Sequence, residues 1–205
     1  MVKPISVSVT ALAQFSCRRG DLIAERVIGP TSGQGIKAHK RIQKTLLEKS
    51  DKRNSMEVET SLNCDCTLEG RSVRLTARVD FLDRAACLVG EIKSTLVPPD
   101  KLPKDQTELH WAQLIIYGYV FSQSLPTDSG EDAPIDLKLV YIDLRADKAH
   151  EQLRTMGREQ LQEFTLAALG DYVRWVVKLE QYNSTMMQNA IQLSFPFGDF
   201  RAGQR

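Results

Sequence analysis

Apolar and polar side chains alternate without a break from residue 73 to residue 81, and this pattern constrains the fold more than any other segment. A period of two is typical of a β-strand that buries one face and exposes the other. The buried face would carry Val73, Leu75, Ala77, Val79 and Phe81, and the opposite face Arg74, Thr76, Arg78 and Asp80. The sequence therefore predicts a two-faced strand with ionisable groups along one face.

A further strand is expected on each side of this segment. Looser alternation over residues 56–66 predicts a preceding strand, and residues 87–93 predict a following strand after a turn at 83–86. Two strands joined by a short turn pair as a hairpin. Three prolines between residues 98 and 103 then predict a loop, because proline has no amide hydrogen to donate to a sheet.

The rest of the chain alternates helical patterns with one more strand. Residues 6–19 predict a short helix that ends near Gly20, and a break rich in Gly, Pro and Ser follows at 29–35. Further helices are expected at 36–49, 106–124 and roughly 150–183, with a strand at 135–144. Helices, three strands, a helix, a strand and a final helix predict an α/β domain, with a central mixed sheet flanked by helices.

The helix expected at 36–49 is cationic and amphipathic. Its apolar stripe carries Ile36, His39, Ile42 or Gln43, and Leu46, so we expect His39 to point inward. The cations on the rest of its surface include Lys37, Lys40 and Arg41. Together they exceed what one small phosphate needs, which favours contact with an anionic polymer. An ordinary solvated helix surface is the alternative interpretation.

Charge is distributed unevenly along the chain. Residues 1–53 hold 11 Lys and Arg against 4 Asp and Glu, a net charge of +7, while the remainder has 16 against 22, a net charge of −6. A basic lobe facing an acidic remainder suits an anionic polymer on one face, with acidic groups left to hold a cation.

Length and composition bound the class of protein. A chain of 205 residues with 42% hydrophobic side chains fits one globular domain. Its apolar runs are far shorter than the ~18 residues of a membrane span, and its start shows no signal-peptide pattern. We therefore expect a soluble, cytoplasmic protein without membrane association, and reduced thiols at Cys17, Cys64, Cys66 and Cys87.

Asp80, Glu91 and Lys93 are the candidate residues for chemistry. Glu91 and Lys93 lie two apart on one strand and so project from the same face, whereas Ile92 between them points into the core. If the hairpin turn is centred between residues 84 and 85, Asp80 lies opposite Val89. Glu91 is then its diagonal neighbour, about 7–8 Å away.

Two carboxylates at that separation repel each other unless a positive charge lies between them. A divalent cation with oxygen ligands at about 2.1 Å bridges such a gap. Acidic residues on the solvent face of a strand are also common in proteins without any site. Glu25 and Glu59 could supply an additional ligand, but nothing in their spacing selects them.

The sequence resembles the PD-(D/E)XK nuclease superfamily, in its RecB-type exonuclease branch. The two-part motif is Arg78-Val79-Asp80 followed by Gly90-Glu91-Ile92-Lys93. Gly35-Ile36-Lys37-Ala38-His39 is similar to the glycine-to-histidine motif of that branch, and Gln113 with Tyr117 fits its Gln-x-x-x-Tyr motif. The segment from Ser8 to Cys17 is similar to its serine-rich entry ending at a cysteine. Together these motifs cover roughly residues 5–145.

The resemblance implies a metal-dependent nuclease that hydrolyses DNA phosphodiester bonds, acting on single strands or on ends. It implies Asp80 and Glu91 as carboxylate ligands of Mg²⁺ or Mn²⁺, with His39 and the Ile92 carbonyl as further donors. Lys93 would orient the attacking water and neutralise charge on the phosphoryl oxygens. Gln113 and Tyr117 would fix the site and contact the nucleic-acid strand.

Many relatives hold an iron–sulfur cluster, with one cysteine near the N-terminus and three near the C-terminus. Cys17 matches the first position, but no cysteine follows Cys87. Cys64 and Cys66 would share one strand face, whereas thiolate clusters usually draw ligands from looser loops. We therefore expect ordinary thiols and no cluster.

The end of the chain has a different character from the rest. We expect residues 1–190 to form one RecB-like nuclease domain and residues 191–205 to form a tail. Phe195-Pro196-Phe197 and Arg201-Ala202-Gly203-Gln204 resemble the start of an XPD/DinG-like helicase, which implies a helicase domain in the same polypeptide. No Gly-x-x-x-x-Gly-Lys-[Ser/Thr] loop is present, so this chain should not hydrolyse ATP.

Two other functions remain compatible with the sequence. The same fold could serve as a catalytically silent module that docks DNA or another protein, although acid, acid and lysine are all present. A metal-dependent enzyme acting on a smaller phosphoester is the other. Steep salt dependence of binding would favour the polymer substrate.

Overall fold

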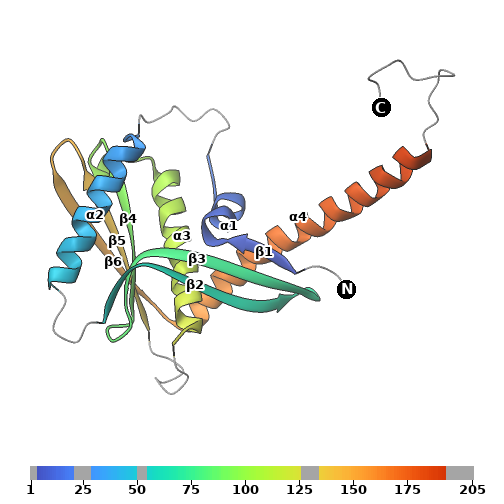
Figure 1. The fold of residues 1–205 in the computed structure, drawn as a ribbon, viewed down its shortest axis with the longest axis horizontal. Coiled ribbons are helices and arrows are strands. Elements are labelled where there is room, and N and C mark those ends of the chain that lie inside the picture. The colour runs from blue at the N-terminus through green and yellow to red at the C-terminus, as the bar shows by residue number, and fades with distance from the viewer. Residues whose placement is uncertain (1–3, 21–28, 50–54, 126–133, 193–205) are drawn as a thin grey trace, which may run out of the picture.

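A computed structural model describes residues 4–20, 29–49, 55–125 and 134–192 (Figure 1). One mixed sheet lies at the centre with helices on both of its faces, which confirms the α/β architecture predicted from the sequence. The strands are β1 (Ile5–Ser8), β2 (Met56–Leu68), β3 (Arg71–Asp83), β4 (Leu88–Thr95), β5 (Ile135–Asp143) and β6 (Lys148–Met156). The helices are α1 (Val9–Ser16), α2 (Ser32–Lys49), the short η1 (Pro99–Lys101), α3 (Lys104–Gln123) and α4 (Arg158–Gln192).

The sheet has the order β1-β3-β4-β5-β6, and β2 pairs with β3 alone. β1 runs parallel to β3 and β4 parallel to β5, whereas the other pairs are antiparallel. Along the edge of β3 that faces away from β2, residues 73–76 pair with β1 and residues 81–83 pair with β4. Residues 77–80 pair with neither strand at this edge, so the sheet is open there.

The two faces of the sheet are covered by different helices (Figure 1). On one face α3 packs against the sheet, and α1 and α4 cover α3 from outside. This explains why α3 is buried from Trp111 to Ser122 on all sides, unlike a surface helix. On the other face α2 covers a smaller core that includes Ala38, Phe81 and Ile92.

Gly90 allows the β3–β4 hairpin to close tightly. Gly90 lies opposite Phe81 in the register, and a Cβ at this position would overlap the Phe81 ring. The buried aromatic ring therefore packs directly on the main chain of β4. This contact fixes how β4 sits against β3 immediately before Glu91.

Two elements differ from the sequence predictions. Residues 5–8 form strand β1 rather than the start of a helix, because Ile5 and Val7 alternate inward beside β3. The helix begins at Val9, capped by the Ser8 hydroxyl, and ends at Ser16. Residues 148–156 form β6 rather than the start of a helix. As a polar edge strand, β6 has little hydrophobic alternation to reveal it.

The α2 helix begins at Ser32, inside the segment predicted to be a break. Thr31 and Gln34 explain this start. The main-chain amide of Gln34 donates to Thr31 Oγ1 at 3.4 Å, and the main-chain amide of Thr31 donates to Gln34 Oε1 at 3.1 Å. This reciprocal pair is a capping box. Ile36, expected on the buried stripe, is 58% exposed, and this part of the prediction is wrong. Ile42 and Leu46 pack on the sheet as predicted, together with Ala38.

The last helix, α4, extends to Gln192, beyond the predicted end near residue 183. The residues compared above with a helicase start, 195–204, lie outside the described residues. No helix in the described ranges has the length and apolar character that crossing a membrane requires.

Candidate active site

Asp80 and Glu91 face each other across the β3–β4 hairpin. The register pairs Phe81 with Gly90 and Leu82 with Val89, so Asp80 and Glu91 are the next residues along their strands. The predicted pairing of Asp80 with Val89 is wrong by two positions. The turn occupies residues 84–87 rather than 83–86, and its last residue, Cys87, adopts a left-handed φ of 49°. Moving the centre of the turn by one residue shifts the pairing by two. A shift of two keeps both side chains on the same face.

Glu91 is a buried carboxylate with a cationic neighbour. Its side chain is 7% exposed, and Lys93 Nζ lies 2.6 Å from its Oε1 atom. Burial raises the pKa of Glu91 to about 7, because the charged form loses its water; the Lys93 ammonium opposes this rise and the Asp80 carboxylate adds to it. A positive ion at this position would therefore stabilise the ionised pair of carboxylates.

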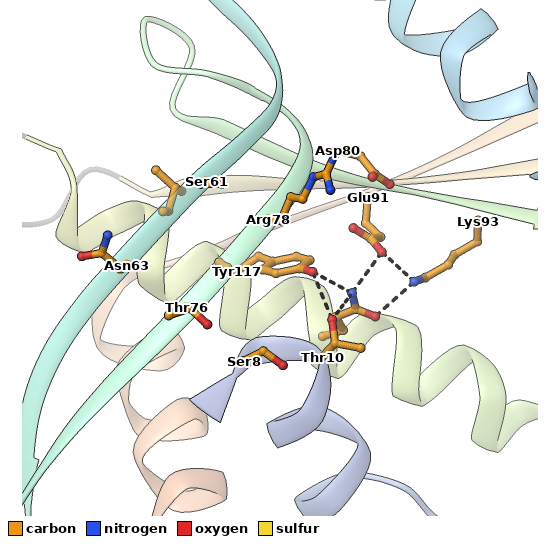
Figure 2. A pocket seen from close by; sticks show the side chains of 13 residues that line it. Ser8, Thr10, Ser61, Asn63, Thr76, Arg78, Asp80, Glu91, Lys93 and Tyr117 are labelled. Atoms are coloured by element: carbon orange, nitrogen blue, oxygen red, sulfur yellow. Dashed lines mark hydrogen bonds and ion pairs between the residues drawn. The ribbon is translucent and has the colours of Figure 1, made fainter. Parts of the chain in front are cut away.

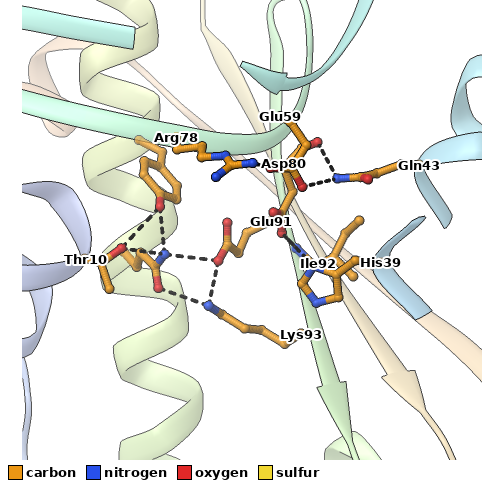
Figure 3. Close-up of polar contacts among 11 residues, drawn as sticks. Thr10, His39, Gln43, Glu59, Arg78, Asp80, Glu91, Ile92 and Lys93 are labelled. Carbon is orange, nitrogen blue, oxygen red and sulfur yellow. Dashed lines mark hydrogen bonds and ion pairs between the residues drawn. The ribbon is translucent and has the colours of Figure 1, made fainter. Parts of the chain in front are cut away.

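Gln113 on α3 forms hydrogen bonds with both Glu91 and Lys93. Its Oε1 accepts a hydrogen bond from Lys93 Nζ at 3.1 Å, and its Nε2 donates to Glu91 Oε1 at 3.0 Å. The same Nε2 lies 2.9 Å from the Tyr117 hydroxyl and 3.4 Å from Thr10 Oγ1 on α1 (Figure 3). Gln113 and Tyr117 thus support Glu91 and Lys93 from buried positions. Thr10 joins them; it lies in the segment from Ser8 to Cys17 that resembles the family's entry motif, but sequence reasoning assigned it no role.

Asp80 is oriented by the main chain of β4 and approached by α2. Its Oδ2 atom accepts a hydrogen bond from the Ile92 amide at 2.7 Å. His39 Nδ1 lies 3.7 Å from the same oxygen, with 27% of the His39 side chain exposed. The expectation that His39 points toward the sheet is confirmed by this position. The structure therefore brings together four residues of the predicted site, Asp80, Glu91, Lys93 and His39 (Figure 3).

Sequence reasoning named Glu59 as a possible additional ligand but missed the second network to which it belongs, on the far side of Asp80. Gln43, which is 6% exposed, donates from Nε2 to Glu59 Oε1 at 2.8 Å and to the Asp80 carbonyl at 3.2 Å. Glu59 in turn lies 2.7 Å from Arg78 Nη2 through its Oε2 atom. Gln43 appeared in the sequence only as an alternative to Ile42 on the helix stripe, and its polarity at a buried position was the one available signal.

A polar pocket of about 650 Å³ opens beside these residues (Figure 2). It lies at the opening in the sheet, where residues 77–80 of β3 lack a partner on one edge. Its wall is built from the end of β1, the start of α1, β2, β3, β4 and α3. The lining residues are Ser8, Thr10, Ser61, Leu62, Asn63, Thr76, Ala77, Arg78, Asp80, Glu91, Lys93, Gln113 and Tyr117.

Comparison with known families shows the superfamily of the chain. The family model described as "PD-(D/E)XK nuclease superfamily" matches residues 11–194, which is most of the chain. The chain belongs to the PD-(D/E)XK nuclease superfamily. The two strands that carry Asp80, Glu91 and Lys93 lie within the matched region.

Two solved structures resemble this nuclease-family chain. The crystal structure of SSO0001 is 21% identical with a TM-score of 0.54, and the match covers 84% of this chain and 78% of that one. This similarity supports the fold alone. A phage-related exonuclease from Haemophilus somnus 129PT is 10% identical with a TM-score of 0.36, over 84% and 82% of the two chains. The comparison with curated proteins found no match.

PD-(D/E)XK nucleases generally use divalent metals such as Mg²⁺ or Mn²⁺. Within the described ranges no three His, Cys, Asp or Glu side chains are grouped to hold a metal ion. Mg²⁺ needs less, because one or two carboxylates, substrate phosphate and retained waters complete its shell. Asp80 and Glu91 fit this requirement: no hydrogen bond from the described residues reaches Asp80 Oδ1 or Glu91 Oε2.

The predicted DNA-contacting cations of α2 do not gather at this pocket. Lys37 and Arg41 line a separate hollow of about 310 Å³, together with Asp147, and Arg41 Nη1 lies 2.6 Å from Asp147 Oδ1. Lys40 is exposed and lines neither pocket. Contact of these three residues with DNA stays a prediction.

The cysteines show no sign of a shared site. Cys17, Cys64, Cys66 and Cys87 are free and half-buried. Burial raises the pKa of the Cys64 thiol to about 11, and Cys66 and Asp65 beside it act in the same direction. A thiol with a raised pKa is a poor nucleophile at neutral pH. Cys64 and Cys66 pack against the main core.

Proposed function

We propose that this PD-(D/E)XK family member is a metal-dependent deoxyribonuclease whose catalytic residues are Asp80, Glu91 and Lys93. One observation carries the proposal. A buried carboxylate, Glu91, lies 2.6 Å from the Lys93 ammonium and across the hairpin from Asp80, and all three border one polar pocket. Burying a carboxylate costs free energy, and an ion pair at the surface avoids this cost. Buried ionisable groups with shifted pKa values are typical of catalytic sites.

Asp80 and Glu91 would hold Mg²⁺ or Mn²⁺, with His39 and the Ile92 carbonyl as further donors. When bound, the cation supplies positive charge that polarises the scissile phosphate and lowers the pKa of water at the site. Lys93 places its ammonium at the pocket, where it can orient the attacking water and neutralise charge developing on the phosphoryl oxygens.

Gln113 and Tyr117 have a positioning role in this mechanism. Gln113 bonds both Glu91 and Lys93, so it holds the carboxylate and the ammonium in one geometry. Tyr117 and Thr10 hold the Gln113 amide in turn. Since Gln113 and Tyr117 also line the pocket, contact with the nucleic-acid strand is part of the proposal.

Within the superfamily we propose the RecB-type branch, with single-stranded DNA or DNA ends as substrate. The order of the Gly35-to-His39 segment, Asp80, Glu91-Ile92-Lys93 and Gln113 with Tyr117 supports this assignment, and so does the convergence of their side chains. A link to a helicase domain in the same polypeptide rests on the sequence of residues 195–204 alone.

The test is a cleavage assay on single- and double-stranded DNA labelled at the 5′ or the 3′ end, with Mg²⁺, Mn²⁺ or EDTA. We expect cleavage with either metal, none in EDTA, and a loss of about 10³-fold or more in Lys93→Met. Lys138→Met is the matched control, because Lys138 is 24% exposed against 23% for Lys93 and is also paired with a glutamate, Glu151. Equal activity in both variants, or cleavage that survives EDTA, would refute the proposal.

A further inference from the structure

Arg78 is a second cation at the pocket, and the mechanism above gives it no role. Arg78 lies two residues before Asp80 on β3, so the two side chains leave the same face of the strand (Figure 2). Among the described residues that line the pocket, Arg78 and Lys93 carry positive charge. Lys93 is already engaged by Glu91 and Gln113. Arg78 is therefore the cation that remains for a second negative group.

The guanidinium of Arg78 has one ionic partner among the described residues, and two of its nitrogens have no hydrogen-bond partner there. Its Nη2 lies 2.7 Å from Glu59 Oε2, while its Nε and Nη1 have no hydrogen-bond partner among the described residues. The side chain is 73% exposed, and it lines the pocket. A guanidinium with free donors in a planar fork matches two oxygens of one phosphate.

The backbone of Glu59 indicates that this arrangement is not an incidental surface pair. Glu59 adopts a left-handed φ of 52°, and it is the one position of β2 that is not paired with β3. Left-handed conformations are unfavourable for residues other than glycine, whereas an exposed ion pair contributes little to stability. The pair with Arg78 therefore does not account for the strained backbone. Strain of this kind is typical of functional sites.

Gln43 connects Arg78 to the catalytic strand. Its amide donates both to Glu59 and to the Asp80 carbonyl, so Glu59, and through it Arg78, is fixed relative to Asp80 (Figure 3). The buried Gln43 amide thereby restrains Glu59, the partner of the Arg78 guanidinium, relative to Asp80.

We propose that Arg78 binds a backbone phosphate of the nucleic-acid strand next to the scissile one, with Glu59 and Gln43 as its positioning residues. The inference rests on the proposed function, because it takes an oligonucleotide as the occupant of the pocket. It adds a substrate-binding residue and a subsite to that function. Thr76, Ser61 and Asn63 continue the same wall with uncharged donors, as the path of a sugar–phosphate chain requires.

The test is equilibrium binding of a fluorescein-labelled single-stranded oligonucleotide of roughly 20 nucleotides, in EDTA, over a series of salt concentrations. We expect Arg78→Met to bind about tenfold more weakly and to lower the slope of log affinity against log salt by about 0.7, the value for one phosphate contact. Arg78→Lys should keep the slope and recover part of the affinity, because it keeps the charge and loses the fork.

Arg74→Met is the matched control. Arg74 lies on the same face of β3, but it does not line the pocket, and Asp65 holds it through two hydrogen bonds of 2.7 and 2.8 Å. An Arg78→Met slope equal to that of wild type and Arg74→Met would overturn the inference while leaving the nuclease proposal intact. Normal binding with the expected slope change but no cleavage under any metal would overturn the nuclease and keep the phosphate contact. Absence of binding by the wild-type chain would overturn both.

Discussion

The Gln43 amide donates a hydrogen bond of 3.2 Å to the main-chain carbonyl of Asp80. This bond takes the place of a missing one in the sheet. Glu59 is the residue of β2 opposite Asp80, but Glu59 and Asp80 are not paired. The strand that carries Asp80, a proposed catalytic carboxylate, is thus held at that point by a helix. The helices on the two faces of the sheet support different residues of the site. α3 supports Glu91 and Lys93, and α2 supports Asp80.

Replacing Gln43 with Leu should therefore impair catalysis. We expect kcat to fall about tenfold, since small displacements of a catalytic group are costly. KM for DNA should rise as well, because Gln43 also positions Arg78 through Glu59. The free energy of unfolding in urea should also fall, by about 1–3 kcal/mol, because two partly buried acceptors lose their donor. A variant with reduced stability but wild-type kcat would show that Gln43 is structural only.

Gly90→Ala tests the close approach in the hairpin. The added methyl group would overlap the Phe81 ring, and the free energy of unfolding should fall by about 1–3 kcal/mol. Gly33→Ala is the control: nothing lies within 4 Å of its Cβ position on α2, so this change should be neutral or stabilise by up to about 1 kcal/mol. Equal effects of the two changes in urea unfolding would contradict the packing described here.

The relative positions of the candidate catalytic residues could be predicted from the sequence more fully than the contacts that hold them in place. Asp80, Glu91 and Lys93 could be assigned to one face because strand alternation is strict and survives a register error of two. The register itself depends on the left-handed backbone of Cys87, which no pattern announces. The roles of Gln43 and Glu59 depend on how α2 packs on the sheet, which is a tertiary contact that local periodicity does not encode.

The two strands missed in the sequence have a shared physical reason. β1 has four residues, which is too short for a period to be distinguished from the first turn of a helix. β6 is an edge strand whose side chains are mostly exposed, so its composition is polar and resembles a helix surface. Both strands are defined by hydrogen bonds to a neighbour already in place, Val73–Thr76 of β3 and Ile135–Asp143 of β5.

The partly buried His110 should make the stability of the protein depend on pH. It accepts or donates a hydrogen bond of 2.9 Å with the Tyr141 hydroxyl, and burial lowers its pKa from 6.5 to about 4, with the Lys93 ammonium acting in the same direction. The unfolded chain then binds more protons than the folded chain between these values. The free energy of unfolding should therefore fall as the pH is lowered from 6.5 to 4, by about 3 kcal/mol at most.

Comparison of wild type with His110→Asn in urea unfolding isolates this contribution, because the other titrating groups are present in both proteins. The stability of wild type relative to the variant should decline as the pH falls through this window. Parallel curves from pH 7 to pH 4 would show that His110 does not titrate as proposed.

Metal binding should be visible in thermal unfolding without DNA. We expect saturating Mn²⁺ to stabilise the wild-type chain by about 3 kcal/mol at a hundredfold excess over the dissociation constant, because the ion binds the folded site. Asp80→Asn should abolish most of this stabilisation. Asp65→Asn, at an exposed carboxylate outside the pocket, should retain it. A metal response unchanged in Asp80→Asn would place the ion elsewhere.

Anomalous diffraction from a crystal soaked in Mn²⁺ tests the shared-cation claim most directly, since it locates the ion independently of activity. We expect a manganese peak in contact with carboxylate oxygens of both Asp80 and Glu91, at roughly 2.2 Å from each, on the pocket side of the hairpin. A peak bound to other residues, or none between these two carboxylates in a crystal of active protein, would contradict it.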